Sequence, residues 1–263
     1  MLSTRVIPCL LLQGHRLVKT VKFSRPVYIG DPINAIKIFN EKEVDELVIL
    51  DITATAEGKK PDVKFISDIA GECFMPLTYG GGIKSLEDIK QILNAGAEKV
   101  VINTYAVQNP GFIKAASELY GSQSIVVSID VRKNLFNKHE VFTCGGKNGS
   151  GIGPVDHAKV MAKMGAGEIF LNSVDRDGTM TGYDIELIKM VSHAVSVPVI
   201  ACGGAGRLSD FTDAVELGGV SAVAAGSFFV FHGKHRAVLI SYPNKDELSA
   251  VLDSRHRADY QNA

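Results

Sequence analysis

Two stretches of sequence decide the fold of this chain, MPLTYGGGIKS at residues 75–85 and VPVIACGGAGR at residues 197–207. Each is a short apolar run that contains a proline and ends in a cluster of glycines. They lie about 120 residues apart, and the same shift superposes the starts of three further pairs of runs: Val6 on Ile125, Glu46 on Glu168 and Val100 on Val220. A repeat that keeps its glycines in register predicts a chain built from two matching halves.

Apolar runs of strand length, rich in Val, Ile and Leu, recur through the whole sequence. They are Val6–Leu12, Glu46–Ile52, Pro76–Tyr79, Lys99–Ile102, Ile125–Val131, Glu168–Asn172, Pro198–Cys202 and Val220–Ala225. Unbroken apolar character predicts strands buried on both faces, as in a parallel sheet. Segments with helical spacing, such as Pro32–Lys42 and Ser85–Ala95, lie between them. Eight βα units predict an α/β fold, a (βα)8 TIM barrel of two pseudo-symmetric half-barrels, with an open doubly wound sheet as the alternative.

Length and composition fit one barrel. We expect a single domain over residues 1–263, with a polar C-terminal tail from about residue 244 to residue 263. The net charge of −1 argues against partners bound mainly by charge, such as nucleic acid or a membrane surface. No apolar run approaches the roughly 18 residues of a membrane span. The 4 cysteines form no C-x-x-C pair and the 7 histidines are scattered, so we expect a cytoplasmic protein with no metal and no cofactor.

Glycine-rich turns follow the predicted strands where a barrel carries its active site. The first half has Gly80–Gly82, and the second half has Gly203–Gly206 and Gly226. Such turns expose backbone N–H groups to a phosphate, although glycine also marks plain turns. Because the clusters are related by the repeat, they predict a substrate with a phosphate at each end, stretched across the barrel mouth.

Several longer motifs carry a resemblance to a known family. They are RVIPCL at 5–10, DELVILDITA at 45–54, YGGGI at 79–83, AEKV at 97–100, INT at 102–104, GSQS at 121–124, SID at 128–130 and DRDGT at 175–179. From near residue 3 to about residue 240, the chain resembles the cyclase subunit of imidazole glycerol phosphate synthase, a lyase of histidine biosynthesis. The resemblance implies a heterodimer with a glutaminase subunit. The barrel would receive ammonia from that partner and condense it with a bis-phosphorylated ribulosyl aminoimidazole substrate.

The resemblance also assigns roles to single residues. One phosphate would be held by Gly82, Asn103 and Thr104, and the other by Asp177, Gly178, Gly204, Gly226 and Ser227. Lys19 matches a lysine that the family folds over its substrate, although by itself it reads as a solvated loop charge. Asp51, at the end of the second predicted strand, is the other candidate of the substrate loop.

Charged residues begin four of the predicted strands at equivalent inward positions: Arg5, Glu46, Lys99 and Glu168. Alternating charges there could form an ion-pair ring that only seals the bottom of the barrel. In the resembling family, the matching ring is the gate through which ammonia enters. The family also implies a glutaminase contact at Glu98, where it usually has an aspartate.

One catalytic position departs from the family. The family cyclises its substrate with two aspartates, one at the end of the first strand and one at the end of the fifth, and acid–base chemistry needs such a pair. Asp130 is the fifth-strand residue, but Leu11 occupies the first-strand position, and leucine has no proton to exchange. Loss of a positioned acid or base typically costs about 10²–10⁴ in rate.

Three functional hypotheses follow. The first is a cyclase subunit, and the second is a paralogue with impaired cyclase chemistry that channels ammonia. A known subgroup of such paralogues works through a third, sugar-amidating enzyme in surface-polysaccharide (O-antigen, lipopolysaccharide) synthesis, and residues 230–243 resemble it. The third hypothesis is a sugar-phosphate isomerase of the related histidine-pathway barrel, against which the gate charges argue.

Overall fold

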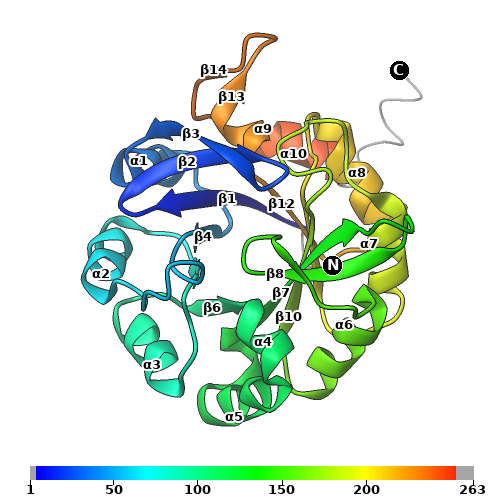
Figure 1. Ribbon diagram of the computed structural model, residues 1–263. Helices are drawn as coiled ribbons and strands as arrows, with labels where there is room; N and C mark the ends of the chain where they lie inside the picture. The colour runs from blue at the N-terminus through cyan, green and yellow to red at the C-terminus, as the bar shows by residue number, and fades with distance from the viewer. Residues whose placement is uncertain (1–3, 253–263) are drawn as a thin grey trace.

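The computed structural model describes residues 4–252, which form a closed parallel barrel with helices around it (Figure 1). The barrel strands are β1 (Arg5–Gln13), β4 (Leu47–Asp51), β5 (Leu77–Gly80), β6 (Lys99–Ile102), β7 (Ile125–Lys133), β10 (Glu168–Ser173), β11 (Val199–Cys202) and β12 (Ala222–Ala225). Each pairs in parallel with the next, and β12 closes the barrel by pairing with β1, where Arg5 lies opposite Ala222. The predicted TIM barrel is confirmed.

Helices connect the strands on the outside of the barrel. They are α1 (Pro32–Glu41), α2 (Val63–Glu72), α3 (Leu86–Asn94), α5 (Pro110–Tyr120), α6 (Pro154–Lys163), α7 (Ile185–Ser192), α8 (Leu208–Glu216) and α10 (Lys245–Leu252). Part of the predicted polar tail thus forms α10, which contacts α8, and residues 253–263 of that tail lie outside the described residues. No helix within residues 4–252 has both the length and the apolar character to cross a membrane.

The twofold repeat extends to the details of the helices. Both α1 and α6 have ten residues and begin with proline. At the start of α3, Asp88 Oδ2 accepts hydrogen bonds from the backbone N–H groups of Lys84 and Ser85. At the start of α8, Asp210 Oδ2 accepts the equivalent pair from Gly206 and Arg207. Matching caps start matching helices because each carboxylate satisfies backbone donors that have no partner within the helix.

Three hairpins and two short helices stand at the carboxyl ends of the strands. The strands β2 (Arg16–Val21) and β3 (Ser24–Gly30) extend β1, and β8 (His139–Thr143) and β9 (Asn148–Gly149) extend β7. After β6 and β12 come the short helices α4 (Thr104–Gln108) and α9 (Ser227–Val230). Only α9 is followed by a small hairpin, β13 (Phe231–His232) with β14 (Ala237–Val238), which projects from the rim (Figure 1).

Two apolar cores explain why the strands have no polar face. The larger core fills the space between barrel and helices, with Phe39 and Phe211 among its fully buried side chains. The smaller core fills the lumen and is formed by inward-facing side chains that include Ile7, Val101 and Phe170. A strand between two cores is apolar at consecutive positions, and this is the pattern of the eight runs.

Candidate functional site

The four charged residues at the strand starts meet in one ring at the amino end of the barrel. Arg5 Nη1 donates to Glu46 Oε2 at 2.5 Å, and Arg5 Nη2 donates to Glu168 Oε1. Lys99 Nζ lies 2.9 Å from Glu168 Oε2 and 3.2 Å from Glu46 Oε2, which closes the ring. We call these four residues the charge ring.

The ring is electrically balanced and largely shielded from water. The side chain of Glu46 is 3% exposed, and its Oε1 also accepts a hydrogen bond of 2.8 Å from Thr78 in the lumen. Burial by itself would lower the pKa of Arg5, but the hydrogen bonds and charges of Glu168 and Glu46 outweigh burial and raise it. The ring is therefore held by attraction between opposite charges in a partly dry site.

Next to the ring, Glu98 is exposed and immediately precedes β6. Phe74 precedes β5 and is 85% exposed, an unusual position for a large apolar side chain. Both residues therefore lie at the amino end of the barrel, the same end as the charge ring.

The apolar lumen connects the charge ring with a cavity at the carboxyl ends of the strands. Ile7, Val48 and Phe170 are at most 1% exposed within the lumen. Above them the cavity has a volume of about 290 Å³ and is bordered by residues from both half-barrels, Leu11 and Asp51 from one and Asp130 and Asn172 from the other. A charged species would lose its hydration in this lumen, whereas a small neutral molecule would lose little.

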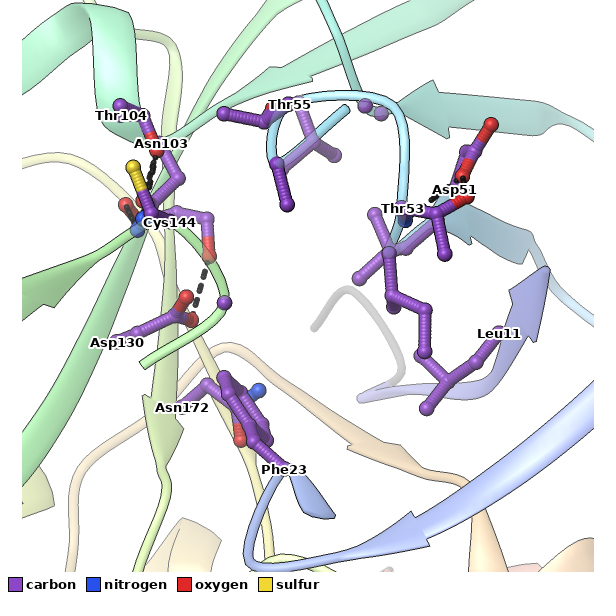
Figure 2. A pocket seen from close by; sticks show the side chains of 18 of the residues that line it. Leu11, Phe23, Asp51, Thr53, Thr55, Asn103, Thr104, Asp130, Cys144 and Asn172 are labelled. Carbon is purple, nitrogen blue, oxygen red and sulfur yellow. Dashed lines mark hydrogen bonds between the residues drawn. The ribbon is translucent and has the colours of Figure 1, made fainter. Parts of the chain in front are cut away.

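Leu11 and Asp130 lie on opposite sides of the cavity (Figure 2). Leu11 is 9% exposed, aligns with Leu50 of β4, and belongs to the apolar lumen core. Asp130 aligns with Asn172 of β10 and accepts a hydrogen bond of 3.2 Å from the Ser128 hydroxyl. The leucine has no titratable group, so on this side of the cavity β1 offers only a hydrocarbon wall.

The carboxyl group of Asp130 has a pKa near neutral pH. Burial raises its pKa to about 7, against the smaller lowering effect of the Ser128 hydroxyl, and the charge of Asp177 adds to the rise. A group with this pKa is present in both protonation states near pH 7, as acid–base catalysis requires. Asp130 can therefore donate or accept one proton, but not both at once.

Asp51, the other candidate of the substrate loop, is bound into its own turn. Its Oδ1 accepts hydrogen bonds from the backbone N–H of Thr53 at 2.9 Å, the Thr53 hydroxyl at 2.8 Å and the N–H of Ala54 at 3.0 Å. These bonds commit one carboxylate oxygen to the local turn. Asp51 therefore borders the cavity as a residue that shapes its loop.

The first predicted phosphate site, here the first cradle, consists of Gly82, Asn103 and Thr104, which all line the cavity. Gly82 has φ +72°, and a Cβ atom there would lie 2.6 Å from the Lys59 carbonyl oxygen, so only glycine fits. The Thr104 hydroxyl accepts a hydrogen bond of 3.0 Å from the N–H of Cys144 on the loop after β8. Segments of both halves thus meet at this end.

The second predicted phosphate site, the second cradle, comprises Asp177, Gly178, Gly204, Gly226 and Ser227. Lys19 lies in this cradle: its Nζ is 2.6 Å from Asp177 Oδ1, and a Cβ atom on Gly226 would come within 2.9 Å of its Cε. The Thr20 hydroxyl donates to Asp177 Oδ2 at 2.9 Å. Lys19 is 5% exposed, so it is a buried ion-pair partner and not the solvated loop charge of the alternative interpretation.

Asn172 did not emerge from the motifs, and Arg236 was covered only as part of the stretch 230–243 that resembles the sugar-amidation subgroup. Asn172 is 6% exposed, and within residues 4–252 its Oδ1 has no hydrogen-bond partner. Asn172 lies on β10 two residues after Phe170 and four residues after Glu168, and both of those side chains face inward. Because side chains alternate along a strand, this spacing alone would have placed Asn172 inside the barrel. Arg236, on the turn between β13 and β14, contacts Gly178 and Ser227. No periodic pattern leads to a turn residue of this kind.

Across residues 4–252, no cluster of three or more His, Cys, Asp or Glu side chains is arranged to bind a metal ion. The cysteines described are all free thiols, with Cys9 and Cys202 buried.

Comparisons with known proteins agree with this geometry. The family model described as histidine biosynthesis protein matches residues 5–236. A Pseudomonas aeruginosa protein, provisionally named imidazole glycerol phosphate synthase subunit hisF2, is 54% identical over 248 residues, 94% of this chain and 99% of the relative. A Leptospira interrogans protein, provisionally named subunit HisF of that enzyme, is 50% identical over 96% of this chain and 100% of the relative. A Vibrio vulnificus protein, provisionally named subunit hisF3, is 46% identical over 96% and 98%.

Barrel, matching family model and full-length relatives lead to one conclusion. The chain belongs to the histidine biosynthesis protein family and, within it, to the cyclase subunits of the imidazole glycerol phosphate synthase type.

Proposed function

We propose that this chain is the ammonia-accepting barrel of a glutamine amidotransferase, bound to a glutaminase subunit at its amino end, and that it binds a bis-phosphorylated substrate at its carboxyl end. The observation that carries the proposal is the alignment along one barrel axis of the charge ring, the apolar lumen and the cavity. This arrangement supports a route on which a small neutral molecule would meet only apolar side chains between the ring and the cavity.

The charge ring is the gate of this path. We assign the moving part to Lys99, because its single flexible ammonium contacts both carboxylates, Glu168 at 2.9 Å and Glu46 at 3.2 Å, so its departure opens one side of the ring. When Lys99 swings away, Arg5 still bonds to both Glu46 and Glu168, and one negative charge of the ring is left unpaired. Beyond the gate, the lumen favours neutral ammonia over ammonium, because ammonium would lose its hydration without finding a counter-ion. Glu98 and the exposed Phe74 offer the glutaminase a charged and an apolar contact beside the entrance.

The first cradle lies within the cavity, and the second borders it through Asp177 and Gly226. We infer that the two cradles hold the phosphates of the substrate, and the ribulosyl aminoimidazole bis-phosphate type fits this two-ended arrangement. Asp130, with a pKa of about 7, supplies one acid–base group. Cyclisation needs a second group on the opposite side, where Leu11 stands. We therefore infer that the cyclase reaction of this barrel is slow.

The alternative function follows from the same leucine. A barrel that keeps its gate and lumen but lacks one acid–base group is suited to channel ammonia onward, through a third enzyme that amidates a sugar in surface-polysaccharide synthesis. The two functions differ in the final nitrogen acceptor. They share the gate, the lumen and the glutaminase.

The experiment combines the chain with its glutaminase and follows glutamate release and free ammonia. The acceptor is the ribulosyl aminoimidazole substrate. The gate variants are also combined with Leu11→Asp, so that product formation is fast enough to measure. We expect Lys99→Ala to release severalfold more ammonia into solution per glutamate than the unaltered ring does. Lys90→Ala, on the exposed face of α3, is the matched control because it removes a lysine far from the ring. Unchanged ammonia escape in Lys99→Ala would contradict the gate.

A further inference from the structure

The turn between β13 and β14 places a cationic side chain, Arg236, against the second cradle. Arg236 Nη1 donates a hydrogen bond of 3.0 Å to the carbonyl oxygen of Gly178, and Nη2 lies 3.5 Å from the hydroxyl oxygen of Ser227. Gly178 and Ser227 come from different βα units, so the guanidinium group bridges two sides of the cradle. A side chain in this position can contact whatever occupies the space between them.

The guanidinium is held in place before any ligand arrives. Its Cζ lies 4.5 Å from the centroid of the Phe231 ring, on the same hairpin, and the side chain is half-buried. Stacking on an aromatic face fixes the plane of a guanidinium. The contacts with Gly178 and Ser227 use two of its five N–H donors, and the remaining donors keep the fork geometry that matches phosphate oxygens.

The two cations of the second cradle differ in their partners. Lys19, the other cation of the second cradle, is paired with Asp177 at 2.6 Å. Arg236 has no carboxylate within ion-pair distance in the part of the chain that the structure describes. The second cradle therefore carries one uncompensated positive charge, which favours an anion.

The two cradles have matching backbones, but the segments that follow them differ. Asn103, before α4, has φ −112° and ψ −80°, and Gly226, before α9, has φ −107° and ψ −70°. The two cradles thus share an unusual backbone conformation. After α4 the chain enters α5 at Pro110, whereas after α9 it forms the hairpin that carries Arg236. The two cradles therefore differ in this hairpin, which follows α9 and has no counterpart after α4.

We propose that Arg236 is a phosphate-binding residue, and that with Gly178, Ser227 and Lys19 it makes the second cradle a site for a dianionic phosphoryl group. This inference rests on the proposed function, because it requires that the second cradle binds phosphate. It adds a charged side-chain ligand to the second end of the site.

The test is a titration of the full-length, ¹⁵N-labelled chain with inorganic phosphate, followed by NMR. The amide signals of Gly226 and Ser227 report on the second cradle, and those of Gly82 and Thr104 report on the first. We expect Arg236→Gln to weaken phosphate binding at the second cradle about tenfold, the loss typical of one charge-assisted hydrogen bond, and to leave the first within about twofold. Arg236→Lys should lie between, because it keeps the charge and loses the fork.

Lys234→Gln is the matched control, since it removes the same charge from an exposed position on the same hairpin. If Arg236→Gln behaves like Lys234→Gln, Arg236 is not a phosphate ligand, while phosphate binding and the proposed function stand. If the unaltered chain binds phosphate at neither cradle, this inference and the phosphate part of the proposed function both fail, and the gate experiment still tests the rest.

Discussion

The two half-barrels share a backbone plan but differ in what they present to the cavity. At matching positions near the ends of β1 and β7, one half has Leu11 in the apolar lumen core and the other has Asp130 beside Ser128 and Asn172. Helices α3 and α8 repeat down to their caps, whereas α1 is capped by the Asp31 side chain and α6 begins after Gly153 without a side-chain cap. A symmetric scaffold therefore keeps its fold while one side chain removes half of an acid–base pair, because the fold depends on burial and backbone bonds and the chemistry on individual atoms.

The largest effect should come from restoring the symmetry of the cavity. Leu11→Asp would place a second carboxyl group opposite Asp130, and we expect ammonium-dependent formation of imidazole glycerol phosphate to rise by about 10²-fold or more. The measurement is turnover of the ribulosyl aminoimidazole substrate at saturating ammonium salt. Leu11→Asn, which is polar and similar in size but cannot exchange a proton, is the control. Rapid turnover by the unaltered chain would contradict the impaired-cyclase interpretation.

A second difference between the halves is the cost of burying Asp130. Its pKa is about 7 in the folded chain and near its ordinary value of 3.8 in the unfolded chain, so the folded state binds the proton more tightly. Stability contributed by the protonated group is therefore present below about pH 4 and is lost as the pH rises to about 7. We expect Asp130→Asn to increase the free energy of unfolding at pH 8 by up to about 4 kcal/mol, with little change at pH 4.

Denaturant unfolding at the two pH values measures this difference. Ser128→Ala is a useful companion, because loss of its hydrogen bond to Asp130 should raise the pKa of Asp130 further. A gain in stability that is equal at pH 4 and pH 8 would show that the pKa of Asp130 is not raised.

The smallest of the three effects concerns the outer helices. His157 in α6 occupies the place that Ala35 has in α1, and both are buried. Burial lowers the pKa of His157 to about 4, and its Nε2 has no hydrogen-bond partner among residues 4–252. Because the folded chain binds a proton at His157 less tightly than the unfolded chain does, the free energy of unfolding should fall as the pH drops from about 6.5 to 4. We expect His157→Leu to remove up to about 3 kcal/mol of that loss, measured by acid unfolding. An unchanged acid transition would mean that His157 titrates normally.

The barrel, its repeat and the inward positions of the charge ring could be predicted from the sequence. Strand alternation and the apolar runs are local properties, so Arg5, Glu46, Lys99 and Glu168 could be aligned without coordinates, and Leu11 could be matched with Asp130. The pairing of Lys19 with Asp177 and the contact of Arg236 with Gly178 became visible only in the three-dimensional structure. These partners come from distant segments, and their approach depends on how the hairpins fold over the rim. The tuning of Asp130 was likewise beyond the sequence, since a pKa depends on the burial and charge that surrounding elements impose.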